Sequence, residues 1–274
     1  MKFGCSCRRA VLLSACLTLT TSLAAAQVDT VAKQRPLFTW RDAVLAGGFG
    51  LGTIAIRPLD SRAAASLQRP QSQQNRLLRD ASIAFRTIAV PGSVIIGVSM
   101  YTVGRLGKND RLATLGLHGT EALFVGEGFA SVLKGGFGRA RPYVDIKNPD
   151  DFQLLRGFHG GDRFRSFPSG HTVAGFAAAA AVTSETSRWW PSSVWYIGPA
   201  MYGGAALIGV SRMYDNRHWA SDVIMGAAIG TFAGTKVVRY HLTHPGNRID
   251  RWLLNVSVPT SNVSALTLSL APLR

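Results

Sequence analysis

PSGHTVAGFAAAAAVTSE, at residues 168–185, is the stretch that best indicates how this 274-residue chain folds. Its Ser-Gly pair is of the kind that precedes helices, and apolar and small residues follow it without apolar–polar alternation. Such a run favours a buried helix over a strand. Five further segments share this character, at about 42–56, 87–104, 112–133, 194–211 and 219–238. The sequence therefore predicts an all-α fold, a six-helix bundle.

The composition limits the class of protein. Apolar residues make up 47% of the chain and charged residues only 16%, which excludes a disordered chain and suggests helices that are apolar on most sides. Lys and Arg number 30 against 15 Asp and Glu, a charge of +15. Nucleic acid, an anionic membrane surface and a phosphorylated substrate are the partners that such an excess suggests. The basic residues are spread over loops, without the dense run that a nucleic-acid groove needs, so we expect no nucleic acid partner.

The first 26 residues have the pattern of an export signal. Basic residues come first, then an apolar stretch at 10–23, then small residues before Gln27. That stretch is shorter than the roughly 20 residues of a membrane span, so an uncleaved membrane helix is the less favoured alternative. A lipoprotein signal ending at Cys16 is another. All three cysteines lie in this segment, and we expect the exported chain to have no thiol, disulfide or cysteine metal site.

The remaining chain divides into a helical domain at 27–250 and a tail at 251–274. In the tail, apolar and polar residues alternate on both sides of the turn-forming residues 259–262, which predicts a short C-terminal β-hairpin. Residues 57–82 are rich in Arg and Gln and predict an amphipathic surface stretch, with lipid headgroups as a possible contact. The apolar helices fit short membrane helices or the buried helices of a soluble bundle equally well.

Three short clusters combine cations or histidine with signals of a helix end. They are KGGFGRARP at 134–142, PSGH at 168–171 and SRMYDNRHWASD at 211–222. In the second, a hydroxyl, a glycine amide and an imidazole precede a helix, where free N–H groups favour an anion. In the third, His218 and Asp222 stand four residues apart, so on a helix the carboxylate can hold one ring N–H.

Taken singly, each cluster has an ordinary explanation as a solvated cap or a structural hydrogen bond. Antiparallel packing of successive helices, however, would bring all three to one face of the bundle. The groups that would meet there are Lys134, Arg141, Ser169, Gly170, His171, Arg212, His218 and Asp222. Such a set is suited to binding a phosphate and stabilising its transferring form.

The chain resembles the type 2 phosphatidic acid phosphatase and vanadium haloperoxidase superfamily, whose signature is K-x6-RP, PSGH and SR-x5-H-x3-D. All three motifs are present, and the helical pattern extends the likeness over roughly 80–240. The resemblance implies a helical bundle of that type and a hydrolase acting on lipid phosphates or small phosphorylated substrates. It also implies an enzyme of the membrane and cell envelope, with the active face towards the periplasm, that needs no metal or other cofactor.

The resemblance also implies a role for each motif residue. His218 would attack phosphorus, Asp222 would orient His218, and His171 would protonate the leaving oxygen and later activate water. The phosphate oxygens would be held by Lys134, Arg141, Ser169, Gly170 and Arg212.

Two other functions stay open at this point. A vanadium-dependent haloperoxidase would use the same pocket, because vanadate mimics the phosphorus transition state. A non-catalytic envelope protein that binds anionic lipid is the other, although it predicts missing site residues and none is missing.

Several residues outside the motif positions are weaker candidates. For His118, Glu121 and Glu127, in the third apolar segment, an intrabundle hydrogen bond is the favoured explanation. No partner suggests itself for His241. Four arginines could add to the electrostatic field at the mouth of the pocket, although exposed cations usually have no specific role: Arg139, Arg163, Arg165 and Arg217. Four loop carboxylates are expected to be solvated: Asp145, Asp150, Asp151 and Asp162.

Overall fold

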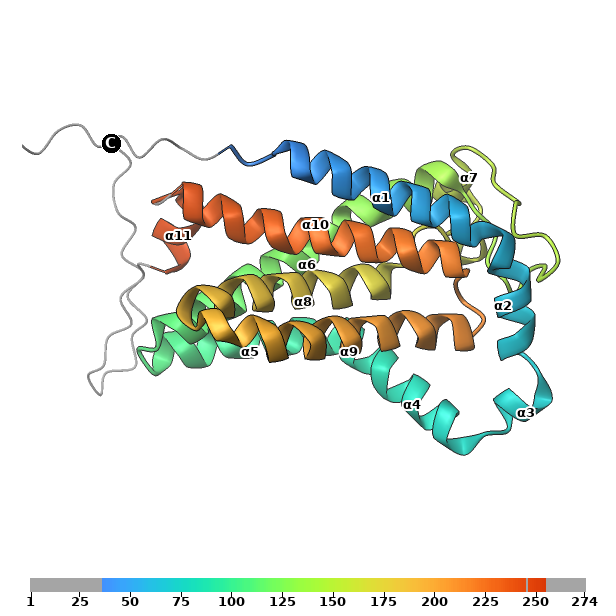
Figure 1. The fold of residues 1–274 in the computed structure, drawn as a ribbon, viewed down its shortest axis with the longest axis horizontal. Helices are drawn as coiled ribbons and strands as arrows, with labels where there is room; N and C mark the ends of the chain where they lie inside the picture. The colour runs from blue at the N-terminus through green and yellow to red at the C-terminus, as the bar shows by residue number, and fades with distance from the viewer. Residues whose placement is uncertain (1–35, 245, 255–274) are drawn as a thin grey trace, which may run out of the picture. The chain divides into compact units, whose positions relative to one another are not determined.

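The computed structural model describes residues 36–244 and 246–254, in which the regular secondary structure is helical and no strand occurs. Six long helices dominate: α1 (Trp40–Ile56), α5 (Ser93–Leu106), α6 (Asp110–Phe137), α8 (Gly170–Trp189), α9 (Val194–Tyr214) and α10 (Ala220–Thr243). Each corresponds to one of the apolar segments, except that α5 begins six residues into the segment predicted at 87–104, after a kink at 88–92. The predicted all-α bundle is thus confirmed, and the long helices run side by side (Figure 1).

Shorter helices, which the prediction of six did not include, join the long ones. They are α2 (Asp60–Leu67), α3 (Pro70–Gln73), α4 (Arg76–Thr87), α7 (Arg156–His159) and α11 (Arg248–Leu253). The polar stretch at 57–82 forms α2, α3 and the first part of α4. It packs on the end of α9, where Gln68 and Gln73 donate to the Tyr214 carbonyl and Ser82 donates to Asp215.

The start of the tail corrects one boundary. Residues 251–253, predicted to begin the hairpin, lie in α11 instead, because the Asn247 side chain accepts the Asp250 N–H at 3.0 Å and caps a helix there. The rest of the predicted hairpin, at 255–274, and the predicted signal at 1–26 lie outside the described residues.

α8 is central in the packing, since it contacts α10, α9 and α6. Its core face is made largely of alanine, which lets α10 approach closely. At Gly230 and Gly234 of α10, a Cβ would lie 2.3 Å from the Val173 carbonyl oxygen and 2.5 Å from that of Ala177. Only glycine allows this approach, which fixes the N-terminus of α8 beside the N-terminus of α10, so that the Ser169 N–H donates to the Asp222 carbonyl at 3.0 Å.

The alternating helix directions give the bundle two functional ends. α6 and α9 finish, and α8 and α10 begin, at the end marked by α2 and α7; the opposite end carries α11 (Figure 1). The three motifs therefore lie at the same end, as the antiparallel order predicted.

Large apolar side chains are exposed along the outer helices. Examples are Leu51 and Ile54 on α1, Ile95 on α5, and Phe124 and Val132 on α6, each at least 60% exposed. Among the described residues, the helical stretch Arg76–Leu106 is the one long and apolar enough to cross a membrane, with a mean hydropathy of 1.6.

Candidate active site at the end of the bundle

His218 lies in the turn between α9 and α10 and is 3% exposed. Arg141 Nη1 donates towards its Nε2 at 3.2 Å, and its Nδ1 faces Asp222 Oδ2 at 3.4 Å, which is long for a hydrogen bond. Burial lowers the pKa of His218 to about 3. Asp222 opposes this effect, and the charges of Arg141 and Lys134 add to it. The ring is therefore neutral at physiological pH, with Nε2 as a lone-pair acceptor.

Asp222, in the first turn of α10, is fully buried and heavily hydrogen-bonded. Its Oδ2 accepts from the Ser166 hydroxyl at 2.6 Å and from the Trp219 N–H at 2.9 Å, and its Oδ1 accepts from Arg139 Nη1 at 2.5 Å. Burial raises the pKa of Asp222, but Arg139, His218 and Ser166 outweigh it and lower the pKa to about 2. Asp222 is thus a fixed carboxylate against the back of the His218 ring.

Arg139 is not the exposed cation expected from the sequence. Its side chain is 1% exposed and joins Asp222 to Asp60 of α2, whose Oδ2 accepts from Nη2 at 2.8 Å. Asp60 also accepts the Ser221 N–H at 2.9 Å. The expectation failed because the loop folds back under α2, where two buried carboxylates require a cation. Asp60 and Ser166 were missed altogether, and the one available signal was that Arg139 lies inside the first motif.

Arg141 is held in place by its surroundings. Its Nε donates to the Asp162 carbonyl at 2.8 Å, Nη2 donates to Asp162 Oδ1 at 2.7 Å, and Nη1 also donates to the Arg217 carbonyl at 3.0 Å. Asp162 was expected to be free in solvent, and it is exposed but paired with Arg141. Partial burial raises the pKa of Asp162, but the charge and hydrogen bond of Arg141 outweigh this effect, so the pKa is lowered. These contacts fix the guanidinium against His218.

Two other loop carboxylates expected to be solvated also have partners. Asp150 is paired with Arg57 at 2.6 Å, and Asp151 is paired with Arg156 at 2.8 Å.

Lys134, in the last turn of α6, lies beside the start of α8. A Cβ at Gly170 would lie 2.6 Å from its Nζ and 2.9 Å from a Glu127 carboxylate oxygen, so glycine leaves the space that both groups use. Burial lowers the pKa of Lys134, and the nearby carboxylate of Glu127 opposes this. An ammonium is therefore held next to the first N–H groups of α8.

His171 and Arg212 complete the group. Burial lowers the pKa of His171 to about 4, and the charges of Arg212, Lys134 and Arg141 add to this effect. Arg212 Nη1 donates to Asp215 at 2.7 Å, while its buried Nε–H has no protein partner. The Ser169 hydroxyl is buried at the N-cap of α8 and accepts from Thr172 at 2.9 Å.

The structure thus brings all eight predicted residues to one end of the bundle. Three cations, free helix N–H groups and two neutral imidazoles suit a bound phosphate oxyanion. Among the described residues, the histidine–carboxylate group with metal-ligand character, His118, His241 and Asp250, lies at the other end.

Comparisons with known proteins agree with this geometry. The PAP2 superfamily model matches residues 117–245. A lipid A 1-phosphatase of Porphyromonas gingivalis is 38% identical over 112 residues, which are 41% of this chain and 22% of that protein. An undecaprenyl-diphosphatase of Sulfolobus acidocaldarius is 30% identical over 88 residues, which are 32% of this chain and 39% of that protein. The matched stretch is therefore well under half the length of these relatives.

The fold is also similar to a solved structure. A transmembrane PAP2-type phosphatidylglycerolphosphate phosphatase of Bacillus subtilis aligns with a TM-score of 0.52 and 19% identity, covering 77% of this chain and all of that one. Helical architecture, motif set and family match point the same way. The segment at residues 117–245, which carries all three motifs, is thus similar to the PAP2 superfamily.

Proposed function

We propose that this protein is a phosphatase that hydrolyses lipid phosphomonoesters or diphosphates through a phosphohistidine intermediate. The observation that carries the proposal is the neutral, buried His218, held between Asp222 and Arg141 within a group of cations. A neutral imidazole is the form that can act as a nucleophile.

In the first step, His218 Nε2 forms a bond to phosphorus while the bond from phosphorus to the ester oxygen breaks. Without substrate, Arg141 Nη1 donates to His218 Nε2. When substrate binds, Nη1 donates instead to a phosphate oxygen, which is the stronger acceptor, and the lone pair of His218 Nε2 becomes free to attack. As His218 becomes positively charged, Nδ1 gains a stronger attraction for Asp222, and the 3.4 Å separation shortens. Asp222 thereby stabilises the charge and fixes the ring.

His171 handles the proton. The protonated ring donates to the leaving oxygen in the first step, and the neutral ring accepts a proton from water in the second, when water attacks phosphorus and the P–N bond breaks. With a pKa of about 4, His171 is neutral until a phosphate dianion arrives beside it. The negative charge of the substrate therefore raises the pKa of His171, so that the ring is protonated when the first step begins.

The remaining residues hold the phosphate oxygens. Lys134, Arg141 and Arg212 supply charge, and Ser169 and the Gly170 N–H supply donors at the start of α8. The free Nε–H of Arg212 is one donor that a phosphate oxygen would satisfy. Such donors stabilise the charge that develops on the oxygens in the transition state.

A lipid substrate is supported by two observations. The relatives include a lipid A 1-phosphatase and an undecaprenyl-diphosphatase. Apolar side chains are exposed on α1, α5 and α6, and Arg76–Leu106 is long enough to cross a bilayer, so membrane association accounts for surfaces that water would not favour. We further propose that residues 1–26 direct export and that the motif end of the bundle faces the periplasm.

Phosphate release from lipid monophosphates and diphosphates, measured with the full chain in detergent, tests the proposal. His218→Ala is expected to abolish turnover, whereas the exposed His159, changed to Ala, serves as the matched control and should retain it. Full turnover by His218→Ala would overturn the mechanism. Vanadate should inhibit the wild-type protein; peroxide-dependent halide oxidation in the presence of vanadate would instead support the haloperoxidase alternative.

A further inference from the structure

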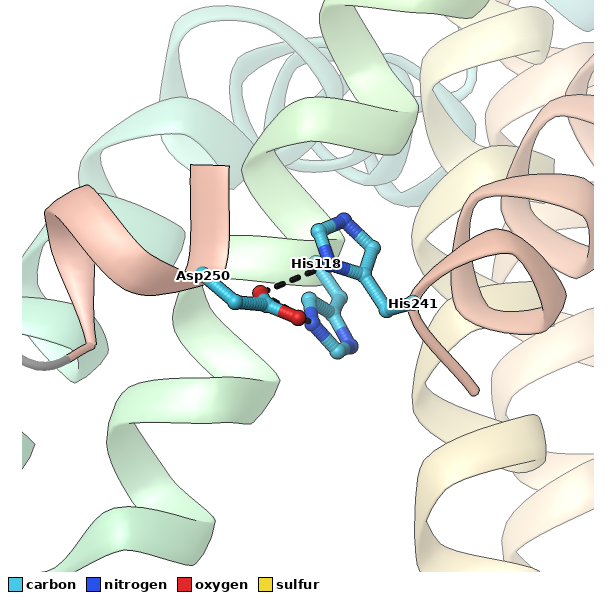
Figure 2. A group of neighbouring side chains, drawn as sticks. All are labelled: His118, His241 and Asp250. Carbon is cyan, nitrogen blue, oxygen red and sulfur yellow. Dashed lines mark hydrogen bonds and ion pairs between the residues drawn. The ribbon is translucent and has the colours of Figure 1, made fainter. Parts of the chain in front are cut away.

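At the end of the bundle opposite the motifs, two histidines and three carboxylates form a second cluster. Figure 2 shows Asp250 of α11 facing His118 of α6 and His241 of α10. Asp250 Oδ1 lies 2.7 Å from His241 Nδ1 and 3.8 Å from His118 Nε2, and one ligand atom of each residue lies within 4.8 Å of the others. Along α8, whose Glu185 belongs to this cluster, the distance from His171 is roughly 21 Å.

One nitrogen in the cluster has no partner. His118 is 3% exposed and its Nδ1 contacts Glu185 at 2.6 Å, while its Nε2 is buried without a hydrogen bond. With the proton on Nδ1, as the contact with Glu185 favours, Nε2 carries a lone pair that faces Asp250 at a distance no proton can bridge. A buried lone pair beside a carboxylate oxygen is unfavourable unless a cation lies between them.

The second nitrogens of both rings are held by carboxylates. Glu185 holds His118 Nδ1 at 2.6 Å, and Glu121 holds His241 Nε2 at 2.7 Å. Carboxylates in this position orient histidines that bind a metal through the other nitrogen. Asn247 supports the third group, because its Nδ2 donates to Asp250 Oδ2 at 2.6 Å and leaves Oδ1 facing the rings.

The charges favour a divalent ion over protons. The rings of His118 and His241 are stacked with centroids 3.9 Å apart, so two imidazolium charges would repel each other at short range. With one ring protonated, its charge and the charge of Arg188, which pairs with Glu185 at 2.6 Å, balance two of the three carboxylates. One negative charge is then left over. A divalent cation bound to two neutral rings brings this set of groups to neutrality.

We propose that His118 Nε2, His241 Nδ1 and Asp250 Oδ1 bind a zinc ion that fastens α11 to α6 and α10. Mixed imidazole and carboxylate ligands suit zinc. Bonds of about 2.1 Å in a tetrahedron place ligand atoms about 3.4 Å apart. The observed separations of 2.7 and 3.8 Å lie on either side of this value, and the third lies within 4.8 Å, so small side-chain movements would complete the geometry. Water fills the fourth position. The distance from His171 separates this site from the phosphate site proposed above, so the zinc ion would act on the position of α11 and not on phosphate release.

The test uses the full chain in detergent, carrying a tag without histidine, stripped with a chelator and then dialysed against zinc. We expect one zinc per chain by elemental analysis and a rise in Tm of roughly 5–10 °C at saturation. Cobalt should give the visible absorption of a tetrahedral site. Absence of both stoichiometric zinc and the rise in Tm would overturn the proposal and leave a hydrogen-bonded cluster only.

Variants separate this site from the phosphate site. His118→Asn and Asp250→Asn should lose the zinc and the zinc-dependent rise in Tm. His244→Asn, on the same helix end as His241 but hydrogen-bonded to Thr243 and Tyr240, is the matched control and should keep both. Zinc retained by His118→Asn at wild-type stoichiometry would refute the assignment. Should a variant fail to fold, the wild-type cobalt spectrum still decides. His218→Ala should bind zinc as the wild-type does, whatever happens to phosphate release.

Discussion

Replacing Arg139 by Met should expose how the site holds its buried charge. Methionine keeps much of the apolar stem volume but removes the guanidinium that lies between Asp60 and Asp222. Both carboxylates are fully buried, so neither can turn to water for compensation. Breaking a buried ion pair by removing one partner costs about 3–5 kcal/mol. For a chain of this size, that corresponds to a fall in Tm of roughly 6–20 °C.

The same change should alter the pH dependence of catalysis. The low pKa of Asp222 in the folded protein contributes stability that is present above the unfolded pKa and is lost as the pH falls towards about 2. Without Arg139, the effect of burial prevails and the pKa of Asp222 rises. Asp222 then takes up a proton at a higher pH and no longer stabilises the charge on His218. The acid limb of the kcat profile should therefore move to higher pH.

The assay combines thermal unfolding in detergent with kcat for phosphate release across the pH range. Arg163→Met is the matched control, because Arg163 is an exposed arginine nearby that lies over the Phe164 ring. Arg139→Lys, which retains the charge but not the fork of donors, should recover part of the pH profile. A normal Tm and an unshifted acid limb in Arg139→Met would refute the reasoning. A lower Tm with an unshifted limb would leave Arg139 a purely structural role.

Three further outcomes follow from the geometry. Gly170→Ala should lower kcat/KM about 10-fold by displacing the Lys134 ammonium, whereas Gly128→Ala, where a Cβ meets nothing within 4 Å, should not. Binding of sulfate, which is a dianion without a proton at pH 6, should take up protons in the wild-type, because the anion raises the pKa of His171 from about 4; calorimetry in buffers of different ionisation enthalpy should find less uptake in His171→Asn. Gly230→Ala should cost about 1–3 kcal/mol of unfolding free energy, measured by denaturation, by forcing α8 and α10 apart.

The long helices and the convergence of the motifs could be predicted because both depend on local patterns. Apolar runs without alternation define helices, and antiparallel order then fixes which loops share an end. The four-residue spacing predicted that His218 and Asp222 lie close together, although His218 lies in the turn before α10 and not on the helix. The sequence therefore predicts that the motif residues share one end of the bundle.

The support of the site could not be predicted, because it depends on contacts between segments far apart in the chain. Asp60 lies in a stretch that looks like a polar surface, yet it is buried and bonded to Arg139 and Ser221. Ser166 has no local signal at all. Whether an arginine is solvated or buried is decided by which carboxylates the tertiary fold brings to it, and sequence spacing carries no such information.

The opposite cluster was missed for the same reason, although its members were visible one by one. His118 was expected to make an intrabundle hydrogen bond, and the contact with Glu185 confirms this. His241, without a predicted partner, contacts both Glu121 and Asp250. Each histidine stands alone in its own segment, without the close ligand spacing from which a metal site can be read in a sequence.

Both clusters depend on the close packing of α8 and α10. α8 carries His171 at one end and Glu185 at the other, and α10 carries Asp222 and His241. Where glycine lets backbone meet backbone, neither helix can slide without collision, so the distance between opposed side chains is fixed at both ends at once. Two groups of buried charge can then be placed without flexible loops. The alanine and glycine content of α8 and α10 is accordingly a requirement of both sites rather than only a sign of tight packing.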